Sequence, residues 1–168
     1  MTEHAVTLRD AADADREAIC QLNRMDEKRL SPMDTERFDV LSAMACYCKV
    51  ATVDDAIAGF LLGFANSTDY ESVNYRWFNE RMKAFFYIDR VVVDARFRKM
   101  GIASAFYRDV QAYAHANDLH WLAAEIDLQP PNTSSLAFHK AFGFNEIGTQ
   151  VYGEGRMVSL QLGPVPAA

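Results

Sequence analysis

A buried strand that leads directly into a helix limits the fold of this chain more than any other feature. Phe85–Val93 is the strongest strand signal in the sequence, and Met100–Asn117 repeats its apolar residues at helical spacing. Leu119–Leu128 predicts another strand, which Pro130 and Pro131 close. A strand–helix–strand unit of this kind predicts a mixed α/β layer, with a binding site at the carboxyl end of its first strand.

The flanking segments complete a predicted order of one strand, two helices, three strands, a helix, a strand, a helix and two strands. Asp13 is predicted to cap the first helix, and Ser31 the second, with Pro32 at its first helical position. Residues 66–83 are predicted to form a long, aromatic-rich connection. The other expected elements are a strand at 6–9, a hairpin of 47–53 with 56–65, a helix at 132–142 and a hairpin of 146–152 with 156–162.

The composition fits one ordinary domain, and we expect a single domain over residues 1–168. Half of the 168 residues (50%) are hydrophobic, so the chain is long enough to bury one sizeable core. The formal net charge is −6. Because binding to a polyphosphate backbone needs clustered basic residues, no nucleic-acid partner is expected. The same acidic field mildly favours a cationic substrate such as an amine.

The cysteines and the apolar runs indicate a cytoplasmic protein. Cys20, Cys46 and Cys48 fit neither a disulfide framework nor a zinc site, so we expect small buried thiols in a reducing compartment. The first residues lack the basic and apolar regions of a signal peptide. The longest apolar run, at 57–65, is far too short to cross a bilayer, so no membrane partner is expected.

The polar loop between the central strand and its helix has the composition of a phosphate site. It carries Arg96, Arg98 and Lys99, and Gly101 and Ala103 then open the helix. The first turn of a helix has unpaired N–H groups and a partial positive charge, and small residues let a phosphate approach them. The strings typical of Walker loops and dinucleotide folds are absent. Alternatively, the small residues let the helix pack closely on a sheet, beside a solvated basic cluster.

Two motifs in this region resemble those of the GNAT superfamily of N-acetyltransferases. The first is Arg98-x-x-Gly101-x-Ala103 after a hydrophobic strand, and the second is Asn132 followed by the string LAFHKAFGF at 136–144. Their order and the surrounding layout resemble the family over most of the chain. The resemblance implies an α/β (α+β) fold with a mixed, mostly antiparallel central sheet of about seven strands and flanking helices. It also implies an acetyl-CoA-dependent N-acetyltransferase, in which a primary amine attacks the acetyl group directly in a ternary complex.

The resemblance further implies a set of residues that bind acetyl-CoA. The strand backbone would pair with the pantetheine arm as an added strand does, and the N–H groups of the loop would hold the pyrophosphate. Asn132 would contact the cofactor near its thioester, and it is also placed to cap a helix. Ser135 is a weaker candidate nearby. The full set is Val91, Val92, Val93, Arg98, Lys99, Met100, Gly101, Ile102, Ala103, Asn132 and Ser135.

The expected general acid departs from the family pattern. Many family members use a tyrosine four residues before the glycine of the second motif, and this chain has His139 there, counted from Gly143. Histidine can also donate a proton, because its ordinary pKa of about 6.5 lies near neutrality. Alternatively, His139 is a helix-surface residue without a chemical role, and Tyr107, Tyr113 or Tyr152 supplies the proton.

Three carboxylates are candidates for the general base or for binding the ammonium group of the acceptor. Asp89 lies in an otherwise apolar strand, and Arg90 is expected on the opposite face, where it would not neutralise Asp89 directly. Glu125 and Asp127 share one face of the next strand. Alternatively, all three carboxylates pair structurally with Arg or Lys side chains.

The acceptor site is expected in the parts that vary with substrate. By resemblance these are the first two helices and their join near 30–34. The aromatic segment 70–78 is a second candidate, in which Tyr75 and Trp77 would wall a pocket for an apolar or cationic group. The two rings equally fit a dimer patch or a minor core. Homodimers are common among such domains, so a homodimer is among the expected assemblies.

Two other functions stay open from the sequence. The departure at His139 supports a non-catalytic acyl-CoA-binding or regulatory domain as the main alternative. An unrelated nucleotide-binding α/β domain would bind ATP or NAD, and the missing nucleotide motifs disfavour it.

Overall fold

The computed structural model describes residues 4–167, and the described chain divides into two compact units. The first unit contains the described residues up to Phe64 together with Asp89–Val110. The second contains Ala65–Ile88 and the described residues from Gln111 onward. The expectation of a single domain over the whole chain therefore stays a prediction.

Three antiparallel strands form the sheet of the first unit. They are β1 (Val6–Asp10), β2 (Tyr47–Val53) and β3 (Ala56–Ala65). The predicted turn at Asp54 and Asp55 joins β2 to β3, and both residues have positive φ, 47° and 65°, as a two-residue hairpin turn requires. Most of β3 is buried, in agreement with its nearly continuous apolar run.

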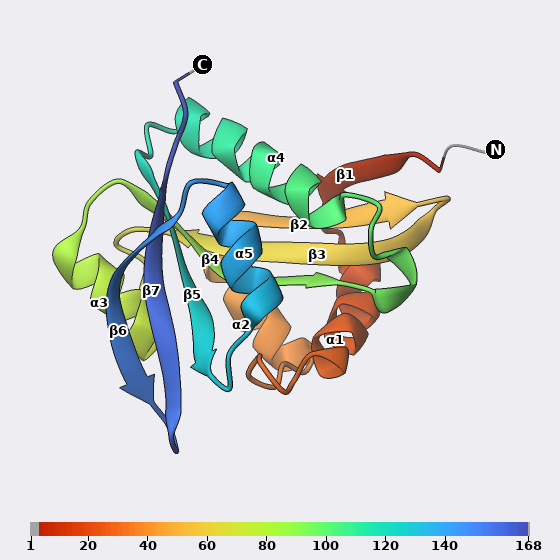
Figure 1. The fold of residues 1–168 in the computed structure, drawn as a ribbon. Helices are drawn as coiled ribbons and strands as arrows, with labels where there is room; N and C mark the ends of the chain where they lie inside the picture. The colour runs from red at the N-terminus through yellow and green to blue at the C-terminus, as the bar shows by residue number, and fades with distance from the viewer. Residues whose placement is uncertain (1–3, 168) are drawn as a thin grey trace. The chain divides into compact units, whose positions relative to one another are not determined.

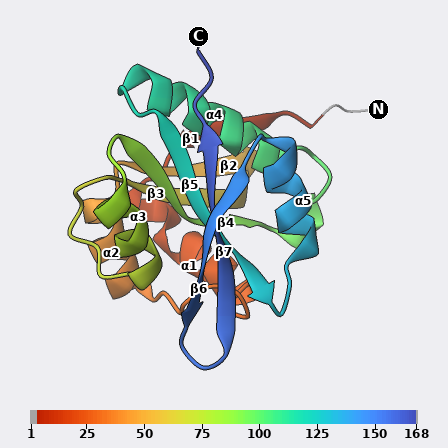
Figure 2. The ribbon, with the colours of Figure 1, turned by 60° about the vertical axis from the view of Figure 1, so that its left-hand side comes forward.

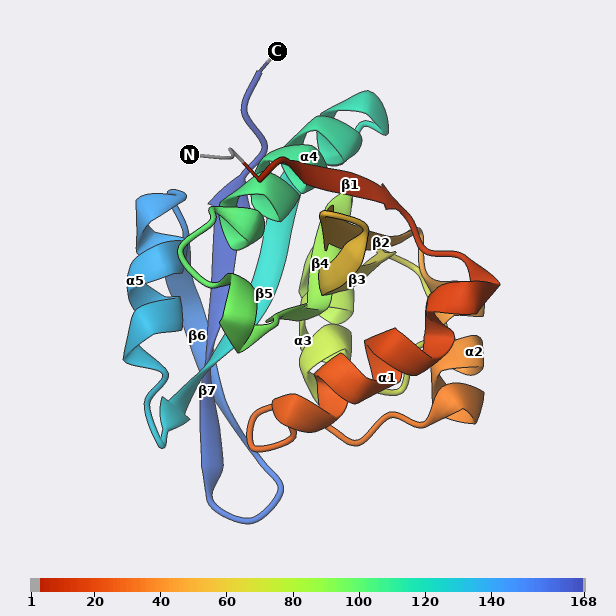
Figure 3. The same ribbon diagram turned by 90° about the vertical axis from the view of Figure 1, so that its right-hand side faces the viewer.

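Two short helices precede β2 in the same unit. They are α1 (Arg16–Met25) and α2 (Thr35–Met44), and they contact each other (Figure 3). Ile19 and Leu41 are fully buried, whereas Met25, at the end of α1, is 68% exposed.

The predicted helix caps are both wrong. Asp13 lies within a short 3₁₀ turn, η1 (Asp13–Asp15), and caps no helix. The helix α2 is capped by Asp34, whose carboxylate accepts a hydrogen bond from the N–H of Arg37 at 2.8 Å. Ser31 is thereby left outside the helix, where it bonds to a strand residue described below.

The second unit is built on three antiparallel strands in the order β5-β7-β6. They are β5 (Trp121–Gln129), β6 (Asn145–Tyr152) and β7 (Arg156–Pro164). Figure 2 shows β6 and β7 as a hairpin. The helix α5 (Thr133–Ala141) connects β5 to β6, and it ends before Gly143, whose φ of 84° confirms the predicted helix stop.

Residues 66–83 contain a helix, α3 (Val73–Arg81), where we predicted a long connection. The hydroxyl of Ser72 accepts a hydrogen bond from the N–H of Tyr75 at 3.3 Å and caps this helix. Tyr75 and Phe78 lie on its buried face. The aromatic residues that suggested a binding loop are therefore core residues at helical spacing.

The central strand–loop–helix passage follows the prediction closely. It consists of β4 (Phe85–Val93), the 3₁₀ turn η2 (Ala95–Phe97) and α4 (Ile102–Ala116). At its start, β4 pairs in parallel with β5, through the residues 85–87 and 121–123. The seven strands follow the order β1-β2-β3-β4-β5-β7-β6, which confirms the predicted mixed α/β sheet with helices (Figure 1).

Candidate active site

The loop after β4 is organised by one buried carboxylate. Asp94 accepts a hydrogen bond from the N–H of Arg96 at 2.9 Å and pairs with its guanidinium at 2.8 Å. These Arg96 hydrogen bonds hold the pKa of Asp94 below its ordinary value, although burial opposes the shift. The N–H of Asp94 donates to the carbonyl of Ala58 at 2.8 Å, which ties the loop to β3. Arg96 is therefore committed to loop structure, and Arg98 and Lys99 are the basic residues left for a ligand.

The turn at Arg98–Gly101 is exposed, basic and open. Lys99 and Gly101 have φ of 65° and 74°, in the region that favours glycine. A Cβ atom added at Gly101 would meet no atom within 4 Å. Within residues 4–167, neither Arg98 nor Lys99 has an ion-pair partner. Open space, two uncommitted cations and the unpaired N–H groups at the start of α4 fit a pyrophosphate group.

The backbone of β4 is accessible around its middle. Val91–Val93 lies beyond the residue pairs that join β4 to β5. Asp89 is half-buried as a whole although its side chain is only 5% exposed, so its exposed part is backbone. At Gly59 of β3, a Cβ atom would lie 2.6 Å from the Val92 carbonyl oxygen, so only glycine permits this close approach. An extended ligand has backbone groups to pair with in this stretch.

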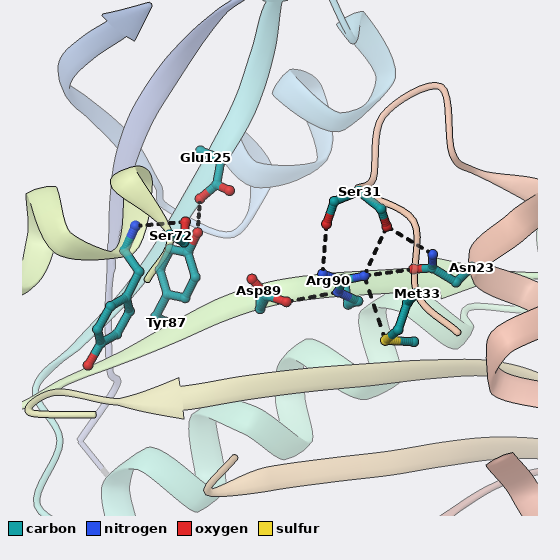
Figure 4. A network of polar contacts seen from close by, with 9 residues as sticks. Asn23, Ser31, Met33, Ser72, Tyr87, Asp89, Arg90 and Glu125 are labelled. Carbon is teal, nitrogen blue, oxygen red and sulfur yellow. Dashed lines mark hydrogen bonds and ion pairs between the residues drawn. The ribbon is translucent and has the colours of Figure 1, made fainter. Parts of the chain in front are cut away.

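Asp89 and Arg90 form a buried ion pair, which corrects the expectation that they point apart. Arg90 Nε donates to the Asp89 carboxylate at 2.8 Å, and the two side chains are 3% and 5% exposed, respectively (Figure 4). Strand alternation fixes the direction of Cβ but not the end point of a long, flexible arginine side chain. The pairing alternative therefore applies to Asp89, whose carboxylate is engaged by the Arg90 guanidinium.

Glu125 has a different partner from the other two carboxylates. The Tyr87 hydroxyl donates a hydrogen bond to Glu125 Oε2 at 2.5 Å (Figure 4). Asp127, on the same face of β5, pairs with Arg156 at 3.2 Å. Glu125 is half-buried and its carboxylate is oriented by this hydroxyl, so it stays a candidate base.

The tyrosines named as alternative acids differ in their surroundings. Tyr107 is 1% exposed. Tyr152 is half-buried at the end of β6, and burial together with the nearby Asp127 raises its pKa. The Tyr152 hydroxyl is therefore protonated at neutral pH and can act as a hydrogen-bond donor.

Asn132 caps α5, as predicted. Its side-chain oxygen accepts hydrogen bonds from the N–H of Ser135 at 3.3 Å and from the Ser134 hydroxyl at 3.2 Å. The role of Asn132 and Ser135 beside a cofactor stays a prediction.

His139 is a core residue and not the helix-surface residue of the alternative. It is 5% exposed, and its ring packs edge-on against Phe138 and Phe144, with centroids 5.5 and 5.0 Å away. Its Nδ1 lies 2.7 Å from the Ser135 carbonyl oxygen, which can only accept, so Nδ1 carries the proton. Burial lowers the pKa of His139, although the bond to Ser135 opposes the shift. A neutral imidazole whose N–H is bound in this way is poorly suited to the predicted role of acid.

Tyr75 and Trp77 are held by core contacts. Tyr75 is 1% exposed, and its hydroxyl donates to the Ala65 carbonyl at 2.7 Å. The Arg81 guanidinium stacks on the Trp77 ring, 4.2 Å from its centroid. Trp77 also lies against Gly148, where a Cβ atom would come within 2.9 Å of the indole. These contacts fit the minor-core alternative better than a pocket wall.

The passage from β4 to α5 falls within a known family. The family model of the acetyltransferase (GNAT) family matches residues 13–144, which is most of the chain. The chain belongs to the GNAT family. It is therefore an acyltransferase, which confirms the predicted family and enzyme class.

Solved structures share the fold of this GNAT chain along nearly its whole length. Ard1 from Thermoplasma volcanium has a TM-score of 0.79 at 18% identity, covering 97% of this chain and 99% of that one. The ribosomal-protein-S18-alanine N-acetyltransferase from Escherichia coli has a TM-score of 0.73 at 14% identity, covering 98% of this chain and 96% of that one. A phosphinothricin acetyltransferase from Sinorhizobium meliloti in complex with AcCoA has a TM-score of 0.72 at 20% identity, covering 95% of this chain and 88% of that one. Identities this low show a shared fold, and comparison with curated proteins found no significant match.

Sequence reasoning missed two functional candidates of this GNAT chain, Tyr87 and Arg90. Each carries polar atoms in an otherwise apolar strand, and buried polar atoms need partners. That rule predicts that the polar atoms of Tyr87 and Arg90 have hydrogen-bond partners. It did not name Glu125 for Tyr87, because those two residues meet only when β4 and β5 pair.

The three thiols of the acetyltransferase differ in burial. Cys20 is buried as predicted, whereas Cys46 and Cys48 are half-buried. Burial raises the pKa of Cys20, and it raises the pKa of Cys48 to about 11. Both thiols are therefore protonated at neutral pH and are weak nucleophiles.

Residues 4–167 contain no cluster of three or more His, Cys, Asp or Glu side chains arranged to hold a metal ion. None of the helices in that range combines the length and the apolar character needed to cross a membrane.

Burial of His139 predicts a stability loss in mild acid. The unfolded residue takes up a proton below its ordinary pKa of about 6.5, while the folded residue, with its lowered pKa, stays neutral until lower pH. The free energy of unfolding should therefore fall as pH drops below that value. His139→Asn keeps an N–H donor for the Ser135 carbonyl but cannot titrate. Its urea midpoint should therefore vary less than that of the wild type between about pH 7.5 and about pH 5.5, on either side of that pKa.

The exposed His115 provides the matched control. His115→Asn makes the same chemical change at an exposed position, so it reports what the substitution itself does to the urea midpoint at each pH. If His139→Asn and His115→Asn lose stability equally on acidification, burial of the His139 ring is not the cause.

Proposed function

We propose that this chain is an acetyl-CoA-dependent N-acetyltransferase that moves an acetyl group to a primary amine by direct attack in a ternary complex. The observation that carries the proposal is the open, basic turn Arg98–Gly101, which leads into α4 in a chain of the GNAT family. Its two uncommitted cations and accessible N–H groups match the chemistry of a pyrophosphate.

The residues of the first unit would hold the cofactor. The N–H groups from Arg98 to Ala103 would bind the pyrophosphate, and the backbone of Val91–Val93 would pair with the pantetheine arm. Acetyl-CoA, when bound, supplies an acetyl group activated as a thioester. Asn132 and Ser135 stay the candidate contacts near that thioester.

Glu125 is the proposed proton acceptor. An attacking amine must be neutral, and a carboxylate can take its proton directly or through a water molecule. The hydrogen bond from Tyr87 fixes the orientation of the Glu125 carboxylate. Asp89 does not compete for this role, because its carboxylate is bound by Arg90.

The departing thiolate needs a proton, and Tyr152 is the proposed donor in place of His139. The raised pKa of Tyr152 keeps its hydroxyl protonated at neutral pH. No covalent acyl-enzyme step is proposed, since the pKa values of Cys20 and Cys48 are raised by burial.

The proposed acceptor is a primary amine of a small molecule, an amino acid or a peptide. The net charge of −6 favours approach of a cationic amine. A cytoplasmic location and a homodimer stay predictions.

Calorimetric titration with acetyl-CoA, CoA, ATP and NAD tests the proposal. We expect both CoA species to bind and the two other nucleotides to bind weakly or not at all, because the chain has no motif for them. If neither CoA species binds to the folded protein, the proposed function is wrong.

A thiol-release assay with acetyl-CoA then tests turnover. The amines are alanyl-alanine amide, L-lysine, putrescine and phenylethylamine, which differ in charge and in apolar area. Release of CoA with at least one of them is expected. Tight binding of acetyl-CoA without release for any amine favours the non-catalytic acyl-CoA-binding alternative.

A further inference from the structure

The buried guanidinium of Arg90 joins three separate segments of the first unit. Its Nε donates to Asp89 at 2.8 Å, and its Nη1 donates to the Asn23 side-chain oxygen at 3.0 Å. Nη1 also lies 3.3 Å from the Ser31 carbonyl oxygen and 3.7 Å from Met33 sulfur, while Nη2 donates to the Ser31 hydroxyl at 3.1 Å. Figure 4 shows β4, α1 and the α1–α2 connection meeting at this one side chain.

The α1–α2 connection, residues 26–34, depends on these bonds. It contains turns but no helix or strand, so it has few hydrogen bonds of its own. The Asn23 amide donates to the same Ser31 carbonyl at 3.1 Å. Asn23, Met33 and Arg90 are 0%, 2% and 4% exposed, so water cannot replace a lost partner easily. Arg90 therefore attaches the connection to β4.

The position of Arg90 along β4 places this attachment beside the expected thioester end of the cofactor. This step rests on the proposed function. If the pyrophosphate lies at Arg98–Ala103 and the arm runs along Val93 to Val91, the thioester end reaches the Asp89–Arg90 part of the strand. A strand advances about 3.3 Å per residue, so this end lies within one or two residues of Arg90. The amine must approach the same place, where Arg90 holds Ser31 and Met33.

We infer that Arg90 is a positioning residue for the acceptor. It fixes the α1–α2 connection beside the thioester end of the cofactor and thereby sets the affinity for the amine. It touches neither the acetyl group nor the amine, and Asp89 serves as its charge partner. This role predicts a selective effect on amine binding, which a general loss of packing would not produce.

The test uses a double variant, Asp89→Asn with Arg90→Met. Removing Arg90 alone would leave the buried Asp89 charge without this partner, which destabilises the fold whatever role Arg90 has in binding. The double variant removes both charges and the attachment together. Arg90→Lys is the conservative variant, because lysine keeps the charge beside Asp89 but lacks the planar fork. Asp15→Asn with Arg9→Met is the matched control, since Arg9 pairs with the buried Asp15 in the same unit at 2.7 Å.

Two measurements are made on each folded variant. Steady-state kinetics use acetyl-CoA and the amine of the panel that the wild type acetylates fastest. The double variant should raise KM for the amine about tenfold or more, with KM for acetyl-CoA within about twofold of the wild type. Arg90→Lys should give an intermediate amine KM, and the control double variant at Arg9 and Asp15 should match the wild type. Amide hydrogen exchange should become faster in residues 26–34 of the double variant.

Each outcome separates this inference from the proposed function. An active wild type whose folded double variant keeps its amine KM, or raises both KM values alike, overturns the positioning role. Unchanged exchange in residues 26–34 overturns the attachment itself. If the wild type acetylates no amine of the panel, the proposed function is wrong, and the positioning role of Arg90 is wrong with it.

Discussion

Gly101→Glu is expected to weaken acetyl-CoA binding by about a hundredfold or more, as measured by calorimetry. The new carboxylate would project into the open space that Gly101 leaves at the basic turn, where no atom lies within 4 Å of its Cβ position. There it would repel the phosphates, and juxtaposed like charges cost several kcal/mol. It would also neutralise the cations of Arg98 and Lys99. The positive φ of 74° adds backbone strain to the variant.

Gly155→Glu separates the charge effect from that strain. Gly155 has a φ of 71° and also has no atom within 4 Å of a Cβ position, but it lies in the β6–β7 turn, outside the basic turn. Both variants should lose similar stability in urea, while only Gly101→Glu should lose acetyl-CoA affinity. Undiminished CoA binding in a folded Gly101→Glu protein would contradict the placement of the pyrophosphate.

Glu125→Gln is expected to lower kcat by about two to three orders of magnitude, which is the usual contribution of a general base. Glutamine has nearly the same shape and can still accept the hydrogen bond from Tyr87, so the variant should stay folded. The affinity for acetyl-CoA, measured by calorimetry, should not change. A loss in kcat without a loss of cofactor binding identifies an effect on the chemical step.

Glu146→Gln is the control for this substitution. Glu146 also accepts a hydrogen bond from a hydroxyl, that of Ser159 at 2.6 Å, and it lies in the same unit. Its kcat should stay within about twofold of the wild type, as for most surface substitutions. If Glu125→Gln retains wild-type kcat, proton transfer does not depend on Glu125, and Tyr152 or water becomes the group to test.

The basic turn Arg98–Gly101 could be recognised from the sequence because its properties are local. Basic residues at 98 and 99, a glycine at 101 and an adjoining helix start lie within a few residues of one another. Positive φ at Gly101 and exposure of the turn follow from that short stretch. The strand β4 was predicted with its observed boundaries, since its apolar run is uninterrupted on either side of Asp89 and Arg90.

The errors at the helix starts have a tertiary cause. Several short polar residues near each start compete for the same capping position. Asp34 bonds to the N–H of Arg37, and Ser31 instead bonds to Arg90. Sequence spacing does not rank these competitors, because the winner depends on where β4 lies. The helix α3 was missed for another reason. Its buried aromatic residues were assigned to a binding loop and not to the packed face of a helix.

The sequence by itself determined the family, the order of strands and helices apart from α3, and the basic turn after β4, because these follow from periodicity and from short motifs. The tertiary structure decided which side chains are partners. It paired Asp89 with Arg90, gave Glu125 the Tyr87 hydroxyl and buried His139 between Phe138 and Phe144. Partners on different elements are brought together by packing, and long side chains reach beyond the face that strand alternation assigns to them.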